Sequence, residues 1–246
     1  MMTPSRWIRL TGATNVRDLG GYTAHGGVTR WGALFRSDSL HKLTETDQRL
    51  LLEQGVRTII DLRHDSEVEA KPNVFANSAD VRYLNIPIFR MFEGDMGDQP
   101  ALDLVSIYRY IVDECQAGVG ETLTAIANAE PGAVLFHCAA GKDRTGVIAA
   151  LLLRLVGVPA ETVVEDFALT AEAMALLRPA LLEQVLQAGG TEEIVDRLLA
   201  SKASDMLTLL TYLDALYDGV IGYVRSLGLS DAQIDGLRAR LLDTTV

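Results

Sequence analysis

The sequence predicts an α/β fold: a mainly parallel central sheet flanked by helices and joined to a helical C-terminal half. Two observations indicate it. Short β-prone runs alternate with helical patterns in the first half of the chain, and from Thr145 onward helical patterns follow one another without a convincing strand. Strands that alternate with helices favour a parallel sheet that is covered on both faces. In such sheets, ligands bind beyond the carboxyl ends of the strands.

Four runs have the length and composition of buried strands. They are Ala33–Arg36, Arg57–Leu62, Val81–Ile86 and Ala133–His137. Helical patterns lie between them at Thr44–Gln54 and Leu102–Ala117. Thr44 and Asp47 stand three residues apart just ahead of two leucines, which is typical of a capped helix start.

The C-terminal half contains five helical patterns, which glycine and proline residues separate at Gly157–Pro159 and Gly189–Gly190. The patterns are Thr145–Val156, Ala160–Ala188, Glu192–Ala200, Asp205–Ser226 and Ser230–Leu242. We expect these helices to pack against the sheet as one domain over residues 1–246.

The composition restricts the possible partners. The 246 residues carry a formal net charge of −11 and a pI near 4.8, which disfavours nucleic acid and anionic membranes. No stretch approaches the roughly 20 apolar residues of a membrane-spanning helix, and the first residues lack the apolar segment of a secretory signal. We therefore expect a cytoplasmic protein, with export by a route that needs no cleavable signal left open.

The two cysteines and four scattered histidines do not favour a disulfide scaffold or a metal site, so we expect no cofactor. Cys115 lies in the helical pattern Leu102–Ala117 without a basic neighbour. That position favours a packing role for it, and a protective disulfide with Cys138 is the alternative.

The segment PGAVLFHCAAGKDRTGVIAALLLRLVG contains most of the functional information. A loop between the strand and the helix points unpaired backbone N–H groups at one spot, where a phosphate dianion can bind. Cys138 begins the loop and Arg144 ends it, and such surroundings favour a thiolate over a thiol. Arg144 is suited to hold two phosphoryl oxygens at once. The expected phosphate-binding residues between and beside them are Ala139, Ala140, Gly141, Lys142 and Thr145, whose hydroxyl is a candidate donor to the thiolate.

The string HCAAGKDRTG at this strand-to-helix junction resembles the signature loop of the protein tyrosine phosphatase superfamily. It is most similar to the atypical bacterial tyrosine and lipid phosphatases, whose loop reads HCxxGKDRT. Three further segments and the stretch around Asp205–Tyr223 also resemble that family: NVRDLGGY at 15–22, LFRSDSL at 34–40 and DLRHDSEV at 61–68. The resemblance implies a cysteine-dependent phosphatase fold and hydrolysis of phosphomonoesters through a phosphocysteine, without metal.

Phosphotyrosine in a protein is the substrate that this resemblance favours. Phosphoinositide or dual specificity is the alternative, because a loop lysine such as Lys142 accompanies highly charged lipid head groups in related phosphatases. A rhodanese-like sulfurtransferase and a phosphate-binding module without turnover are more remote alternatives. The presence of both Cys138 and Arg144 disfavours the module.

The acid that protonates the leaving oxygen has several candidates. Asp143 lies inside the loop, where the resemblance makes a carboxylate a candidate acid, and Asp61 ends a strand on the ligand side of the sheet. The alternative role of Asp61 is an ion pair with Arg144. The acidic segment Phe89–Pro100 adds a third group of candidates, namely Glu93, Asp95 and Asp98.

Other residues are expected to support the site. His137 is expected to orient the loop by hydrogen bonding, and Asp18 and Arg36 to belong to hydrogen-bonded networks under it. Arg63 is a candidate for contacting substrate or for an ion pair with a carboxylate.

Residues 171–200 allow two interpretations. Their apolar residues recur at intervals that place them on one helix face, and Gly189–Gly190 permits a sharp turn into a second helix. Such a helix pair either extends the core or, as the resemblance suggests, forms a lid that closes over Cys138. The residues on that face include Met174, Leu177, Leu181 and Leu182.

Overall fold

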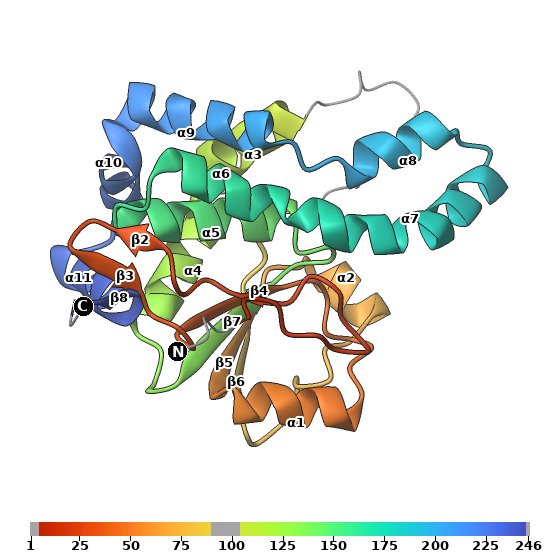
Figure 1. Cartoon of the computed structure of the whole chain (residues 1–246), viewed down its shortest axis with the longest axis horizontal. Helices are drawn as coiled ribbons and strands as arrows, with labels where there is room; N and C mark the ends of the chain where they lie inside the picture. Colours follow the sequence, from red (N-terminus) through yellow and green to blue (C-terminus); the bar gives the residue numbers. More distant parts are fainter. Residues whose placement is uncertain (1–4, 90–103, 245–246) are drawn as a thin grey trace.

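The computed structural model of the chain describes residues 5–89 and 104–244, which form a five-stranded sheet with helices on both faces (Figure 1). The strand order is β1-β4-β7-β5-β6, and only the edge strand β1 runs antiparallel to its neighbour. All four predicted strands are confirmed, and they form the parallel part of the sheet. The strands are β1 Arg17–Asp18, β4 Leu34–Ser37, β5 Val56–Asp61, β6 Arg82–Asn85 and β7 Ala133–His137.

A second, antiparallel sheet joins β2 (Thr23–Ala24), β3 (Gly27–Thr29) and β8 (Leu242–Asp243). It corrects the prediction that no strand follows Thr145. Strand β8 has only two residues and follows directly on a helix, so it carries no alternation that sequence reading can detect.

The helices confirm most of the predicted patterns and divide three of them. Helix α1 begins after Thr44, which forms a capping box with Asp47, as expected. The predicted helix Leu102–Ala117 ends at Glu114, and a second helix begins at Gln116. The bounds are α1 Glu45–Glu53, α2 Asp65–Ala70, α3 Leu104–Glu114, α4 Gln116–Ala127, α5 Asp143–Leu155, α6 Ala160–Ala168, α7 Thr170–Gln187, α8 Glu192–Leu199, α9 Ala203–Tyr217, α10 Gly219–Ser226 and α11 Asp231–Leu241.

The two other divisions are breaks that the apolar periodicity does not reveal. Leu169 separates α6 from α7 in the predicted helix Ala160–Ala188. Asp218, with a left-handed φ of 55°, separates α9 from α10 in the predicted helix Asp205–Ser226. Gly219 follows it with a φ of 89°, so an aspartate–glycine pair marks this break, a turn signal that the prediction of one continuous helix overlooked.

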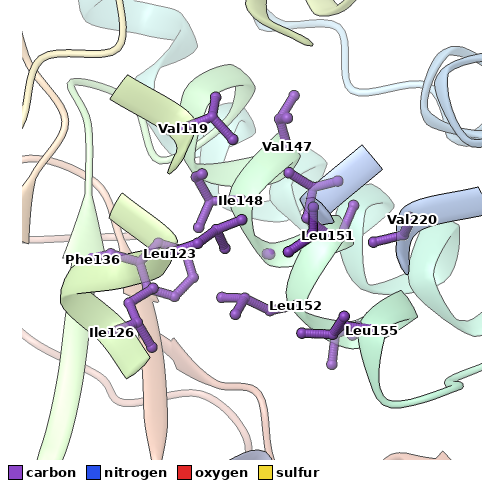
Figure 2. Close-up of a cluster of buried hydrophobic side chains, with 14 of the residues drawn as sticks. Val119, Leu123, Ile126, Phe136, Val147, Ile148, Leu151, Leu152, Leu155 and Val220 are labelled. Atoms are coloured by element: carbon purple, nitrogen blue, oxygen red, sulfur yellow. The ribbon is translucent and has the colours of Figure 1, made fainter. Parts of the chain in front are cut away.

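The core has two parts because side chains alternate between the faces of the sheet. On β7, Val134 and Phe136 join the cluster under the C-terminal helices, whereas Ala133 and Leu135 join the cluster under α1. Helix α5 is the centre of the larger cluster, where its apolar side chains meet α4, the sheet and α10 (Figure 2). Since α5 is apolar on nearly every side, burial fixes it firmly behind the loop at its N-terminus.

Helices α7 and α8 form a hairpin that extends from one side of the molecule (Figure 1). Only Thr170, Ala173 and Met174 of α7 and Val195 of α8 are buried. Leu177, Leu181 and Leu182 are half-buried. No helix among residues 5–89 and 104–244 is long and apolar enough to span a membrane. The cytoplasmic location stays a prediction.

Candidate active site

The loop that links β7 to α5 lies at the carboxyl end of the parallel strands, where the α/β pattern predicts a ligand site. Cys138 follows the last residue of β7, and Arg144 lies in the first turn of α5. Both side chains are buried, with exposed fractions of 3% and 2%. These two side chains are therefore shielded from bulk solvent in this conformation, whereas Ala139 of the same loop is exposed.

The carbonyl groups of this loop are turned outward by donors from other segments. The carbonyl oxygen of Ala139 accepts from the amide of Ser39 at 3.0 Å. The side-chain amide of Asn15 donates to the carbonyl oxygens of Ala140 at 3.0 Å and Gly141 at 3.1 Å. Arg36 donates to the same Gly141 oxygen at 2.9 Å.

The backbone N–H groups of the loop have the opposite environment. From Ala139 to Thr145 they make no hydrogen bond to any residue in the described part of the chain. A peptide group is planar, so turning its carbonyl outward turns its N–H toward the inside of the loop. Consecutive N–H groups at a helix N-terminus form a binding site for an anion such as phosphate.

Gly141 is required by the shape of the loop. Its φ of +67° lies in the left-handed region, and an added Cβ would stand 2.5 Å from the carbonyl oxygen of Ser37. The loop therefore lies against the end of β4 more closely than any other residue at this position would allow.

His137 is buried, and its surroundings define its tautomer. The Asn73 side-chain oxygen accepts from the Phe75 amide, so the Asn73 nitrogen faces His137 Nε2 at 2.8 Å. His137 Nε2 is therefore the acceptor, and Nδ1 carries the proton that it donates to the carbonyl oxygen of Cys138 at 3.0 Å. Burial lowers the pKa of His137, which also favours the neutral ring. The geometry matches the predicted orienting role.

Arg144 is held by Glu67 of α2, a partner that the sequence did not reveal. Its Nη1 and Nη2 atoms donate to the two carboxylate oxygens of Glu67 at 2.6 and 2.9 Å, and Nη1 also donates to the carbonyl of Phe89 at 3.0 Å. Burial opposes the charge of Arg144, but the bonds to Glu67 and the nearby Cys138 outweigh it and raise the pKa of Arg144.

These bonds use three of the five N–H groups of the Arg144 guanidinium. The Nε–H group and one Nη2–H group remain, and they form the side of the fork that matches two oxygens of a phosphoryl group. Glu67 therefore fixes the guanidinium without occupying the edge that a phosphate needs.

Asp143 and Asp61, the two main candidates for the acid, have contrasting environments. Asp143 is buried and accepts from the hydroxyl of Tyr108 at 3.0 Å, and burial raises its pKa despite the nearby Lys142. A raised pKa keeps a carboxyl group protonated over a wider pH range, which an acid catalyst needs.

Asp61 pairs with Arg63 and not with Arg144, which was one of the alternatives left open. Its carboxylate accepts from Arg63 Nη2 at 2.6 Å and from the Tyr83 hydroxyl at 3.0 Å. Burial alone would raise the pKa of Asp61, but the hydrogen bonds and the charge of Arg63 lower it. Of the two roles left open for Arg63, the structure therefore contains the ion pair with a carboxylate.

Lys142 and Thr145 complete the predicted loop residues. The buried ammonium of Lys142 donates to the carbonyl of Leu198 in α8 at 2.7 Å and lies 3.6 Å from Asp143. The hydroxyl of Thr145 is buried and has no partner among the described residues. It is therefore available to a group inside the loop.

The prediction that Asp18 lies in a network under the loop needs correction. Its carboxylate accepts from the amides of Gly20 and Gly32, both at 2.7 Å, and within the described part of the chain it makes no hydrogen bond to the loop. Neighbouring residues of a strand point to opposite faces, and on β1 it is Arg17 that joins the network with Arg36.

Some candidates and alternatives from the sequence are not decided by the geometry of the loop. Glu93, Asp95 and Asp98 lie outside the described residues. Cys115 is half-buried with a free thiol, and burial together with Glu114 raises its pKa to about 11. Among the described residues, no group of three metal-binding side chains is suitably placed for an ion.

The comparisons with known proteins define the chain as a cysteine-dependent phosphatase, a phosphoric monoester hydrolase, and the loop with its cysteine and arginine is its candidate site. The chain belongs to the tyrosine phosphatase family, whose profile matches residues 8–243. Family membership confirms the resemblance seen in the sequence.

Curated relatives agree with this assignment. The chain is 32% identical over 217 residues to a tyrosine-protein phosphatase of Nostoc commune, covering 85% of this chain and 74% of that protein. It is 28% identical over 275 residues to the triple specificity protein phosphatase PtpB of Mycobacterium tuberculosis, covering 95% and 98%. A crystal structure of TpbA from P. aeruginosa matches at 20% identity with a TM-score of 0.33, over 89% of this chain and 94% of that one.

Proposed function

We propose that the protein hydrolyses phosphotyrosine in protein substrates, with Cys138 as the nucleophile and Arg144 as the phosphate clamp. One observation carries the proposal: Cys138 stands at the base of a loop whose carbonyls are all turned away and whose N–H groups face inward. This arrangement stabilises the charge on the phosphoryl oxygens without rearrangement during the reaction.

The first step forms a bond between Cys138 Sγ and phosphorus while the bond from phosphorus to the ester oxygen breaks. The leaving oxygen takes the proton of the Asp143 carboxyl group. In the second step the Asp143 carboxylate removes a proton from water, whose oxygen attacks phosphorus. The phosphorus–sulfur bond then breaks, which releases inorganic phosphate and restores the thiolate.

Asp143 fits this role better than Asp61. A buried carboxyl with a raised pKa holds its proton, whereas a carboxylate paired with Arg63 has already lost it. We assign Asp61 to positioning, because its carboxylate holds Arg63 and accepts from the Tyr83 hydroxyl.

The α7–α8 hairpin is the proposed lid of the site. Lys142 connects the loop to the C-terminal end of α8, and most of the hairpin surface is exposed. Because Cys138 and Arg144 are almost fully buried, a substrate reaches them only after part of this cover moves. Few residues of the hairpin are buried, so we infer that it moves at low cost.

A phosphoinositide is the second candidate substrate. The ammonium of Lys142 lies beside the phosphate loop and is bound to a neutral carbonyl, so a second phosphate group on a lipid head group is a stronger partner for it. The relative PtpB, described as a triple specificity phosphatase, also favours testing beyond phosphotyrosine.

The test is a substrate panel with purified protein: p-nitrophenyl phosphate, phosphotyrosine, phosphoserine and phosphothreonine peptides, and phosphoinositides. We expect metal-independent turnover that is fastest on phosphotyrosine and absent in Cys138→Ser. Cys138→Ser should still bind tungstate, because the loop remains. Turnover that survives Cys138→Ser, or that is lost from the wild type with EDTA, would contradict the mechanism.

A further inference from the structure

A buried carboxylate outside the loop, Asp166 of α6, collects three donors from the N-terminal part of the chain. It accepts from Arg17 Nε at 3.1 Å, from Arg36 Nη1 at 2.7 Å and from the Tyr22 hydroxyl at 2.8 Å. Asp166 itself is 2% exposed. Burial opposes its charge, but the two guanidinium groups outweigh it and hold the pKa of Asp166 far below its usual range.

Both arginines continue from Asp166 to the phosphate loop. Arg36 uses its second terminal nitrogen to donate to the carbonyl oxygen of Gly141 at 2.9 Å. Arg17 donates to the side-chain oxygen of Asn15. This bond leaves the Asn15 nitrogen to donate to the carbonyls of Ala140 and Gly141.

These two routes act on neighbouring peptide groups. Holding the Ala140 carbonyl outward turns the amide of Gly141 inward, and holding the Gly141 carbonyl outward turns the amide of Lys142 inward. Gly141, which these two peptide groups share, has a left-handed φ of +67°. The buried carboxylate of Asp166 thus holds the arginines, and through them the donors, that fix the direction of the Gly141 and Lys142 N–H groups.

We propose that Asp166 is a positioning residue for the phosphate-binding loop, acting through Arg36 and through the pair Arg17–Asn15. The proposal rests on the proposed function of the loop and adds a residue that the signature string does not contain. Arg17 also donates to the hydroxyl of Thr170 at 3.1 Å, so the same centre holds the first residue of α7, the start of the proposed lid.

A purely electrostatic role and a positioning role of Asp166 predict opposite changes in anion affinity when Asp166 is replaced by asparagine. Asp166→Asn removes a negative charge and leaves Arg17 and Arg36 uncompensated, which by charge alone strengthens binding of an anion. Loss of loop orientation weakens that binding. We expect weaker binding, because the loop N–H groups contact the anion directly and act at shorter range.

The experiment measures tungstate affinity by calorimetry at a temperature where every variant is folded, together with hydrolysis of p-nitrophenyl phosphate. Asp166→Asn should weaken tungstate binding about tenfold or more, and kcat should fall with it. Asn15→Leu, which removes the donor to the loop but no charge, should give the same loss. This second variant keeps the test open if Asp166→Asn does not fold.

Asp47→Asn is the matched control, because Asp47 is equally buried and accepts from the amides of Thr11, Gly12 and Thr44 but makes no bond to the loop. It should lower thermal stability and leave tungstate affinity unchanged. Wild-type affinity in both Asp166→Asn and Asn15→Leu would overturn the positioning role. A wild type without tungstate binding or turnover would instead overturn the proposed function.

Discussion

The phosphate loop and the α7–α8 hairpin are in contact, yet the molecule holds them in opposite ways. Residues 139–141 of the loop each have a carbonyl fixed by a donor from another segment, the adjacent His137 holds the carbonyl of Cys138, and the helix behind them is buried. The hairpin has few buried residues and exposes Leu176 and Leu186 at 64% and 54%.

The difference separates two requirements of phosphoryl transfer. Charge stabilisation needs donors that are already in place, and a rigid loop supplies them. Substrate entry needs a cover that opens at low cost, and a weakly packed hairpin supplies it. Changes in the loop should therefore alter chemistry, whereas changes in the hairpin should alter access.

The largest effect is expected from Arg144→Lys, which keeps the charge but loses the planar fork. We expect kcat/KM to fall by at least about 100-fold on every substrate, because transition-state charge loses a preorganised donor pair. Steady-state kinetics on p-nitrophenyl phosphate and a phosphotyrosine peptide measure it. Near-normal rates would mean that Arg144 does not contact the phosphoryl group.

The next effect concerns the proton donor. Asp143→Asn should lower kcat about 100-fold for a poor leaving group and far less for a good one, which needs no proton. Because the acid must be protonated, wild-type activity falls as the pH rises through the raised pKa of Asp143. Asp143→Asn should lose this basic limb in a pH–rate profile.

The control for this prediction is Asp61→Asn, which should retain the basic limb. If Asp61→Asn loses it and Asp143→Asn keeps it, the assignment of the acid is reversed. If both keep it, the acid belongs to the segment that contains Glu93, Asp95 and Asp98.

Glu67→Gln should have a smaller effect. Glutamine keeps one oxygen for the helix cap, so the variant removes the charge of Glu67 and one of its two bonds to Arg144. We expect kcat/KM to fall about tenfold, which is the scale of one charged hydrogen bond. Equal kcat/KM in Glu67→Gln and wild type would show that Arg144 does not need Glu67.

The same pair predicts a pH dependence of stability. Burial alone would raise the pKa of Glu67, but Arg144 lowers it below the usual 4.5. A carboxyl group whose pKa is lowered in the folded state stabilises the protein at pH values above its unfolded-state pKa. This stabilisation is lost as the pH falls through the folded-state pKa. Urea unfolding should show wild type more stable than Glu67→Gln at pH 7, with the difference narrowing below pH 4.5.

The smallest effect on chemistry is expected from Lys142→Met, which removes the link between the loop and Leu198. Hydrogen exchange should become faster in α8, and peroxide should inactivate the enzyme sooner, because the thiolate loses part of its cover. Arg197→Met, an exposed change on the same helix, is the control. Slow exchange across 171–200 in the wild type, matching α5 and unchanged by vanadate, would favour the core-extension interpretation.

The sequence predicted those features whose signals are contiguous. Each central strand is one apolar run, and the loop is one string of residues, so both were found with their positions. The sequence named both Asp143 and Asp61 as candidate acids but did not distinguish them. The distinction comes from the burial of Asp143 and from the ion pair of Asp61 with Arg63, and both depend on the folded structure.

The residues that support the loop were mostly missed because they come from distant parts of the chain. Glu67 lies 77 positions from Arg144, and Asp166 lies 149 positions from Arg17. A buried carboxylate of this kind gives no local signal. Asn15 and Arg17 do belong to the NVRDLGGY segment, but the prediction named Asp18 in that segment and not these two residues.

The measurement that tests the central claim most directly is the trapping of a phosphorylated enzyme. Wild-type protein is mixed with a radiolabelled phosphotyrosine peptide, quenched in acid within the first turnover and digested for peptide mapping. We predict label on the peptide that contains Cys138, and none in Cys138→Ser. Label on a different residue, or hydrolysis without any labelled enzyme at all quench times, would contradict nucleophilic catalysis by Cys138.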